Sequence, residues 1–139
     1  IGMIKPSGYA AVSDCVFASA SPSVNHFPTS LLLHSSGRLL VAFSNATGPV
    51  TEVYSYPVTA TDIGAGVSAF NNQSVLYGVT AMTELPNGHV LIASGAAGYN
   101  TVEEFSYDTS TNTLTRVSNT ALIGATAYSR SITSLLIAE

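Results

Sequence analysis

Short apolar segments separated by turn residues make up most of the chain, a pattern typical of β-strands. Residues 79–85 mix apolar and small side chains and are followed by a Pro-Asn-Gly turn that ends at Gly88. Val90–Ala93 is wholly apolar, which indicates a strand buried on both faces. Residues 102–107 alternate between two faces, and Leu114 lies on an outer strand. No segment follows a helical period, so the pattern predicts an all-β fold.

The pattern occurs twice, and the two copies are 51 residues apart without a gap. The offset holds at glycine, acidic, aromatic and aliphatic positions alike. The matched pairs are Gly37 with Gly88, Glu52 with Glu103, Tyr54 with Phe105, Tyr56 with Tyr107, and Ile63 with Leu114. A constant offset over such different residue types indicates that the structural unit is itself repeated.

Each repeat is interpreted as four short antiparallel strands, which describes one blade of a β-propeller. Two repeats cover about residues 26–76 and 77–127, and residues 128–139 with 1–25 supply a partial blade, so that 1–139 is a single propeller-like unit. Such a set of blades leaves the ring incomplete. We therefore expect other copies of the chain, or the remainder of a longer chain, to complete it.

The last residues align with the first, innermost strand of a blade, whereas residues 1–12 align weakly with a third and fourth strand. An unpaired apolar strand edge is avoided in proteins. We expect residues 132–138 to pair with another copy or with residues 1–12. That pairing would bury Leu135, Leu136 and Ile137.

The motifs within each repeat resemble kelch or galactose-oxidase-type blades. The sequence Leu-Pro-Asn-Gly at 85–88 precedes the apolar run, and Tyr107 precedes Leu114 by the seven residues that separate Tyr from Trp in such blades. The chain departs from the family because it has no Trp and no intact Gly-Gly pair. The resemblance implies a propeller, and most relatives of this type bind proteins, while a minority are copper oxidases.

The composition excludes some classes of partner. Charged residues make up 9% of the chain, the net charge is −4 and the pI is about 5.1. Four cations are too few to neutralise a nucleic-acid backbone or to form a polybasic membrane-binding segment. No apolar run approaches the length of a membrane span, so membrane insertion is not expected. Polarity comes instead from 19 Ser and 15 Thr, which favours an extracellular, cell-surface or virion location, although Thr also favours strands.

No group of residues forms a recognisable catalytic or metal-binding motif, so neither catalytic residues nor a cofactor nor a metal is predicted. Cys15 is the single cysteine and is interpreted as a buried structural thiol. The three histidines, His26, His34 and His89, lack metal-ligand spacing. Glu103 and Glu104 are adjacent on a strand and point to opposite faces, so they cannot act as a pair.

Two triplets match the acceptor pattern for N-glycosylation, and they begin at Asn45 and Asn72. Both triplets map to predicted loops. Whether either asparagine is glycosylated is left open, because about two such triplets are expected by chance in a chain of this composition.

With catalysis and metal binding not predicted, binding of a partner through loops is the remaining type of function. Loops between the second and third strands, and between successive blades, share one face of a propeller. These loops carry tyrosine, asparagine and arginine, which suit protein or glycan contacts. The predicted ligand-binding residues are Tyr77, Tyr99, Asn100, Tyr128, Arg130 and Asn72. The alternative for Tyr77 and Tyr128 is that they wedge between blades.

Three functions follow in order of preference. The first is a non-enzymatic recognition module that binds a protein or glycan through propeller loops. The second is a structural subunit of a virion, fibre or extracellular filament, based on low charge and an unclosed ring. The third is part of a larger propeller enzyme whose catalytic groups lie elsewhere.

Overall fold

The computed structural model describes residues 2–3, 16–17, 26–45, 48–59, 63–71, 76–96, 99–118, 120, 132 and 134–137. Within these ranges the regular structure consists of strands, which confirms the predicted all-β class. The described residues include no helix long and apolar enough to cross a membrane.

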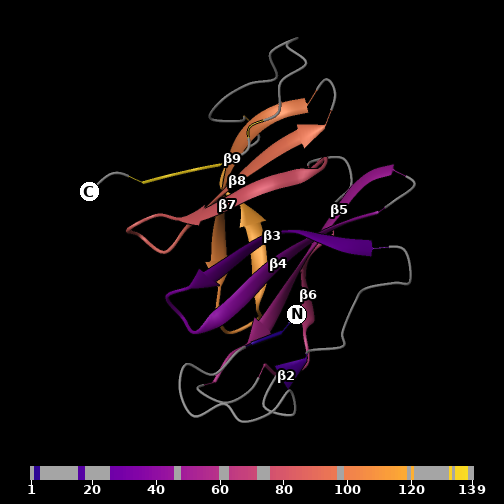
Figure 1. The fold of residues 1–139 in the computed structure, drawn as a ribbon. Coiled ribbons are helices and arrows are strands. Elements are labelled where there is room, and N and C mark those ends of the chain that lie inside the picture. The colour runs from indigo at the N-terminus through magenta and orange to yellow at the C-terminus, as the bar shows by residue number, and fades with distance from the viewer. Residues whose placement is uncertain are drawn as a thin grey trace.

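Two four-stranded antiparallel sheets form the body of the protein, and the strands of each follow one another in chain order (Figure 1). Sheet 1 consists of β3 (His26–His34), β4 (Arg38–Asn45), β5 (Gly48–Pro57) and β6 (Val67–Phe70). Sheet 2 consists of β7 (Val79–Glu84), β8 (Val90–Ala96), β9 (Tyr99–Asp108) and β10 (Thr113–Arg116). A separate small ladder joins β1 (Gly2–Met3) to β2 (Val16–Phe17).

The repeat found in the sequence is also a repeat in the backbone. Gly37 and Gly88 occupy equivalent hairpin turns with φ of +77° and +79°, a region that side chains other than glycine rarely adopt. Each first strand carries an irregularity at the same place, Thr29 in one and Thr80 in the other. The two threonine hydroxyls donate to the carbonyls of Ala42 and Ala93, both at 3.4 Å. The offset of 51 residues therefore describes conformation as well as sequence.

The fourth strands break this equivalence. In sheet 2, Asp108 accepts hydrogen bonds from Ser110, which lower its pKa, and the tight turn leads directly into β10. In sheet 1, Ile63 makes an isolated bridge to Val58, and β6 begins at Val67, five residues after position 62, which is the repeat equivalent of the start of β10 at Thr113. Gly66 lies so close to the Tyr56 ring that a Cβ atom would collide with it. The expected outer strand is therefore displaced rather than absent.

The two sheets pack face to face, and the side chains between them form the main core. We call the faces of each sheet the front face and the back face, with repeat-equivalent residues on faces of the same name. The front face holds Leu31, Leu39, Val41 and Tyr54 in sheet 1, and Met82, Val90, Ile92 and Phe105 in sheet 2. The back face holds Leu32, Leu40, Ala42 and Val53 in sheet 1, and Ala81, Leu91, Ala93 and Val102 in sheet 2.

The front face of sheet 2 packs on the back face of sheet 1. Leu40, Ala42 and Val53 share one buried cluster with Val90, Ile92 and Phe105. Equivalent strands are neighbours across this contact: β3 lies beside β7 (Figure 1), and β6 lies against β10. The sheets are thus stacked head to tail rather than related by a two-fold axis. The outer face of sheet 1 is its front face, and the outer face of sheet 2 is its back face.

Two described residues near the end of the chain lie on the back face of sheet 2. Ile132 and Leu135 pack against Ala81, Ala93 and Val102, and the Thr80 hydroxyl donates to the Ile132 carbonyl. The segment therefore sits beside β7, as an innermost strand would, but residues 132 and 134–137 are not assigned to a strand. Leu136 is 92% exposed within one chain, so its expected burial by another copy or by residues 1–12 stays a prediction.

Candidate functional site

Three of the predicted ligand-binding residues, Tyr77, Tyr99 and Asn100, belong to the end of sheet 2 that carries the β8–β9 turn. Tyr99 starts β9 opposite Ala96, and Asn100 pairs with Gly95. Tyr77 directly precedes Gly78, whose carbonyl accepts a hydrogen bond from the Gly95 amide at 3.0 Å. The backbone therefore brings these three predicted residues to one end of sheet 2.

Tyr77 and Asn100 differ in burial, which makes Tyr77 the better candidate for a contact at the surface. Tyr77 is half-buried, whereas the Asn100 side chain is 6% exposed. Asn71, which follows β6 at the same end, is exposed. Tyr128, Arg130 and Asn72 lie outside the described residues, so their assignment stays a prediction. Cys15 also lies outside them.

A polar link fixes this end to the neighbouring sheet. The Thr51 hydroxyl on β5 accepts hydrogen bonds from the amides of Gly78 and Val79, at 3.0 and 3.4 Å. Thr51 is fully buried, so these bonds satisfy an oxygen that would otherwise be desolvated without compensation. The backbone that follows Tyr77 is therefore held against sheet 1 by these two hydrogen bonds.

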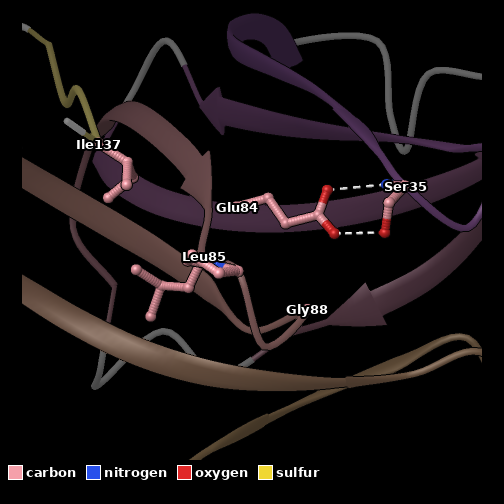
Figure 2. A pocket seen from close by; sticks show the side chains of 6 residues that line it. Ser35, Glu84, Leu85, Gly88 and Ile137 are labelled. Atoms are coloured by element: carbon pink, nitrogen blue, oxygen red, sulfur yellow. Dashed lines mark hydrogen bonds between the residues drawn. The ribbon is translucent and has the colours of Figure 1, made fainter. Parts of the chain in front are cut away.

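The opposite end of the sheets carries a second polar cluster, which sequence reasoning did not anticipate. The β3–β4 turn of sheet 1 docks there on the end of β7 (Figure 2). The Ser35 amide donates to one Glu84 carboxylate oxygen at 2.7 Å, and its hydroxyl donates to the other at 2.5 Å. His34 Nε2 lies 3.0 Å from the Gly88 carbonyl oxygen and 3.4 Å from Glu84. Together these contacts clamp the hairpin turns of the two sheets.

Beside this clamp lies a pocket of about 440 Å³. Its lining combines the Ser35–Glu84 pair with apolar side chains from the β7–β8 turn and from the end of the chain: Leu85, Pro86 and Ile137 (Figure 2). Both Glu84 oxygens already accept hydrogen bonds from Ser35. The carboxylate therefore acts as a link between the sheets rather than as a free base.

Tyr107 extends the polar contact between the sheets. Its hydroxyl lies 2.7 Å from the Ser55 hydroxyl, and its ring meets His34 edge to face with centroids 4.9 Å apart. Arg38 donates to the hydroxyl and the carbonyl of the same serine, at 2.9 and 3.1 Å. Because Ser55 is fully buried, its hydrogen bond to Tyr107 positions the two sheets relative to one another, while Arg38 holds the serine within sheet 1.

The adjacent glutamates of β9 point to opposite faces, as the strand period predicts. Glu103 shares the front face with Ile92 and forms an ion pair with Arg116 at 2.5 Å. Burial raises the pKa of the Glu103 carboxyl, although the charge of Arg116 opposes that shift. Glu104 lies on the back face and contacts His89 Nδ1 at 2.6 Å. The two carboxylates thus belong to separate pairs and do not form a shared acid–base site.

The histidines are spread over the fold. His26 starts β3 at the end that carries the β4–β5 turn, whereas His34 and His89 lie at the end that carries the β3–β4 and β7–β8 turns. In the described part of the chain, no three His, Cys, Asp or Glu side chains are grouped so that they could hold a metal ion.

Comparisons with known proteins returned no matching family model, no matching curated protein and no matching solved structure. The resemblance to kelch-type blades therefore stays a prediction from the motifs.

Proposed function

We propose that the chain is a set of β-propeller-type blades that serves as a non-enzymatic recognition module for a protein or glycan. The observation that carries this proposal is the head-to-tail stacking of two repeat-equivalent sheets, front face on back face, with first strands adjacent and fourth strands adjacent. Blades of a propeller stack in this manner around an axis. In such an arrangement the inter-blade loops gather on one face.

The contacts at that loop end support a binding role. Tyr77 is half-buried on a backbone held by Thr51, and Asn71 is exposed nearby along the chain. A partly exposed tyrosine on a rigid backbone offers contact area at a small cost in conformational entropy. The described carboxylates Glu84, Glu103 and Glu104 are each engaged with a partner, which fits recognition better than acid–base catalysis.

The test is binding to a glycan array and to a set of extracellular protein fragments, with loop-end and opposite-end variants compared. Tyr77→Ala, Tyr99→Ala and Arg130→Ala, combined, should weaken binding by about tenfold or more, because truncated tyrosine and arginine hot spots each remove more than about 1 kcal/mol. Pro86→Ala with Asn87→Ala, in the exposed β7–β8 turn, is the matched control and should leave binding unchanged. Full binding by the loop-end variant would remove the named residues from the site.

A structural subunit of a virion, fibre or filament is the second candidate. The specific observation in its favour is that head-to-tail packing is heterologous, and such packing extends into polymers when the rotation does not close. Electron microscopy of the purified chain distinguishes the two candidates. Open-ended fibres favour the structural role, whereas discrete rings with ligand binding favour recognition.

A further inference from the structure

A partly buried carboxylate lines the pocket beside the clamp, and its hydrogen-bond partners are neutral. The Glu84 side chain is 19% exposed, and its two oxygens accept hydrogen bonds from the amide and the hydroxyl of Ser35. In the described part of the chain, the one basic group within ion-pair distance of Glu84 is His34, whose Nε2 lies at 3.4 Å. The negative charge of Glu84 is therefore compensated only if the His34 ring is protonated on both nitrogens.

The hydrogen bonds of His34 identify a neutral ring instead. Its Nδ1 accepts a hydrogen bond from the Ser36 amide at 3.1 Å, so this nitrogen carries no proton. Its Nε2 lies 3.0 Å from the Gly88 carbonyl oxygen, which can only accept, so the single ring proton is on Nε2. The charge of Glu84 is thus left without a counter-charge among the described residues. A carboxylate that is largely removed from water gains most from a full positive charge beside it.

The polar atoms around the pocket are acceptors, because the donors of Ser35, Leu85 and Gly88 are already used. The amides of Leu85 and Gly88 donate to backbone carbonyls at 2.8 and 2.9 Å, and both donors of Ser35 are taken by Glu84. Pro86 has no N–H group. No Lys, Arg or His is among the described residues that line the pocket. The lining therefore suits a ligand group that donates hydrogen bonds and carries a positive charge.

The shape of the site narrows the class of cation. Ser35 engages both oxygens of the carboxylate, so a guanidinium cannot form its usual forked pair from that side, whereas an ammonium needs one lone pair. Leu85 and Ile137 are half-buried, and in the view of Figure 2 they lie on the other side of Glu84 from Ser35. The volume of about 440 Å³ is within the range of small-molecule sites.

We propose that this pocket binds a primary ammonium group on an apolar stem, with the ammonium at Glu84 and the stem against Leu85 and Ile137. The pocket lies at the opposite end of the sheets from the predicted loop residues, so the inference does not depend on recognition through the loops. Two sources share this chemistry: a free alkylamine and a lysine side chain of a partner protein.

Titration of the whole chain with hexylammonium, followed by heteronuclear NMR, tests the site. The amide signals of Ser35 and Gly88 should shift and saturate, whereas those of Gly78 and Gly95 at the other end of sheet 2 should not. Hexan-1-ol has the same stem without the charge and should bind about tenfold more weakly or less, because hydrogen bonds between charged groups are stronger than neutral ones. Absence of saturable shifts, shifts confined to other parts of the chain, or equal binding of the alcohol overturns the proposal.

A matched pair of variants separates the site from the net charge of the chain. Glu84→Gln keeps the length of the side chain and an oxygen that accepts from Ser35, and it should weaken hexylammonium binding by about tenfold or more. Glu104→Gln removes a carboxylate that is paired with His89 and does not line the pocket. It should change the affinity by less than about twofold, since exposed charges at a distance are screened. Equal losses in both variants would refute the role of Glu84.

Ile137→Ala provides a second measurement if Glu84→Gln disturbs the clamp. It shortens the apolar wall and leaves the hydrogen bonds between Ser35 and Glu84 in place, and it should weaken hexylammonium binding by about threefold or more. An unchanged affinity would contradict the placement of the stem.

A capped Gly-Lys-Gly peptide, whose one ammonium is on the lysine side chain, distinguishes the two sources. Peptide binding that shifts the Ser35 and Gly88 amides and that Glu84→Gln weakens supports the site as a lysine receptor. Binding of hexylammonium without binding of the peptide supports a site for free amines. Neither readout involves the loop end, so loss of the predicted loop contacts leaves this inference intact.

Discussion

Replacing Phe105 with alanine is the most direct test of the face-to-face packing of the sheets. The Phe105 side chain is fully buried in the cluster that both sheets share. Its ring meets Phe70 of β6 edge to face, with centroids 5.1 Å apart and an interplanar angle of 77°. Removing a buried phenylalanine ring lowers the free energy of unfolding by about 3–5 kcal/mol. That loss is a large part of the total of about 5–15 kcal/mol that a domain possesses.

Urea and thermal unfolding followed by circular dichroism measure the effect. The Phe105→Ala variant should unfold on the order of 10–20 °C below wild type. Phe27→Ala is the matched control, because the same atoms are removed from a side chain that is 49% exposed. Its free energy of unfolding should change by less than about 1 kcal/mol.

A double-mutant cycle then isolates the contact between the sheets. Phe70→Leu and Phe105→Leu, made singly and together, should show a coupling energy of about 0.5–1.5 kcal/mol. A Phe105→Ala variant as stable as the Phe27→Ala control, with no coupling to Phe70, would refute the shared core.

Three further predictions concern turns, charge and the end of the chain. Gly37→Ala and Gly88→Ala should each destabilise the protein by about 1–2 kcal/mol, because φ is positive in both turns while no atom lies within 4 Å of an added Cβ; clearly unequal losses would contradict the equivalence of the turns. The raised pKa of Glu103 means that the folded state holds its proton more tightly than the unfolded state, so the free energy of unfolding should fall as pH rises from the ordinary value of 4.5 through the raised pKa. Glu103→Gln should remove this dependence from urea titrations at several pH values, and an unchanged slope would assign it to another group. Deleting residues 132–139 uncovers Ala81, Ala93 and Val102 and should lower the melting temperature, whereas an unchanged melting temperature would show that this segment is dispensable.

The sequence by itself determined the all-β class, the hairpin turns and the repeat. These features depend on local chemistry: glycine at positive φ sets the turns at Gly37 and Gly88, and the strand period sends Glu103 and Glu104 to opposite faces. The sequence pattern also located two buried strands, since the predicted segment Val90–Ala93 lies within β8 and the predicted segment 102–107 lies within β9. The position of β6 could not be predicted from the sequence. It depends on the close approach of Gly66 to the Tyr56 ring, which is a contact between segments rather than a local preference.

Only the tertiary structure decided which faces meet and which polar groups join them. Ser35 and Glu84 lie 49 residues apart, and nothing in their local sequence indicates that they form a clamp. Repeat alignment relates Glu84 to Leu33, yet the difference in their exposure arises from the neighbouring sheet, which covers one and not the other. Local sequence specifies how each strand alternates, whereas the burial of a given face depends on the whole stack.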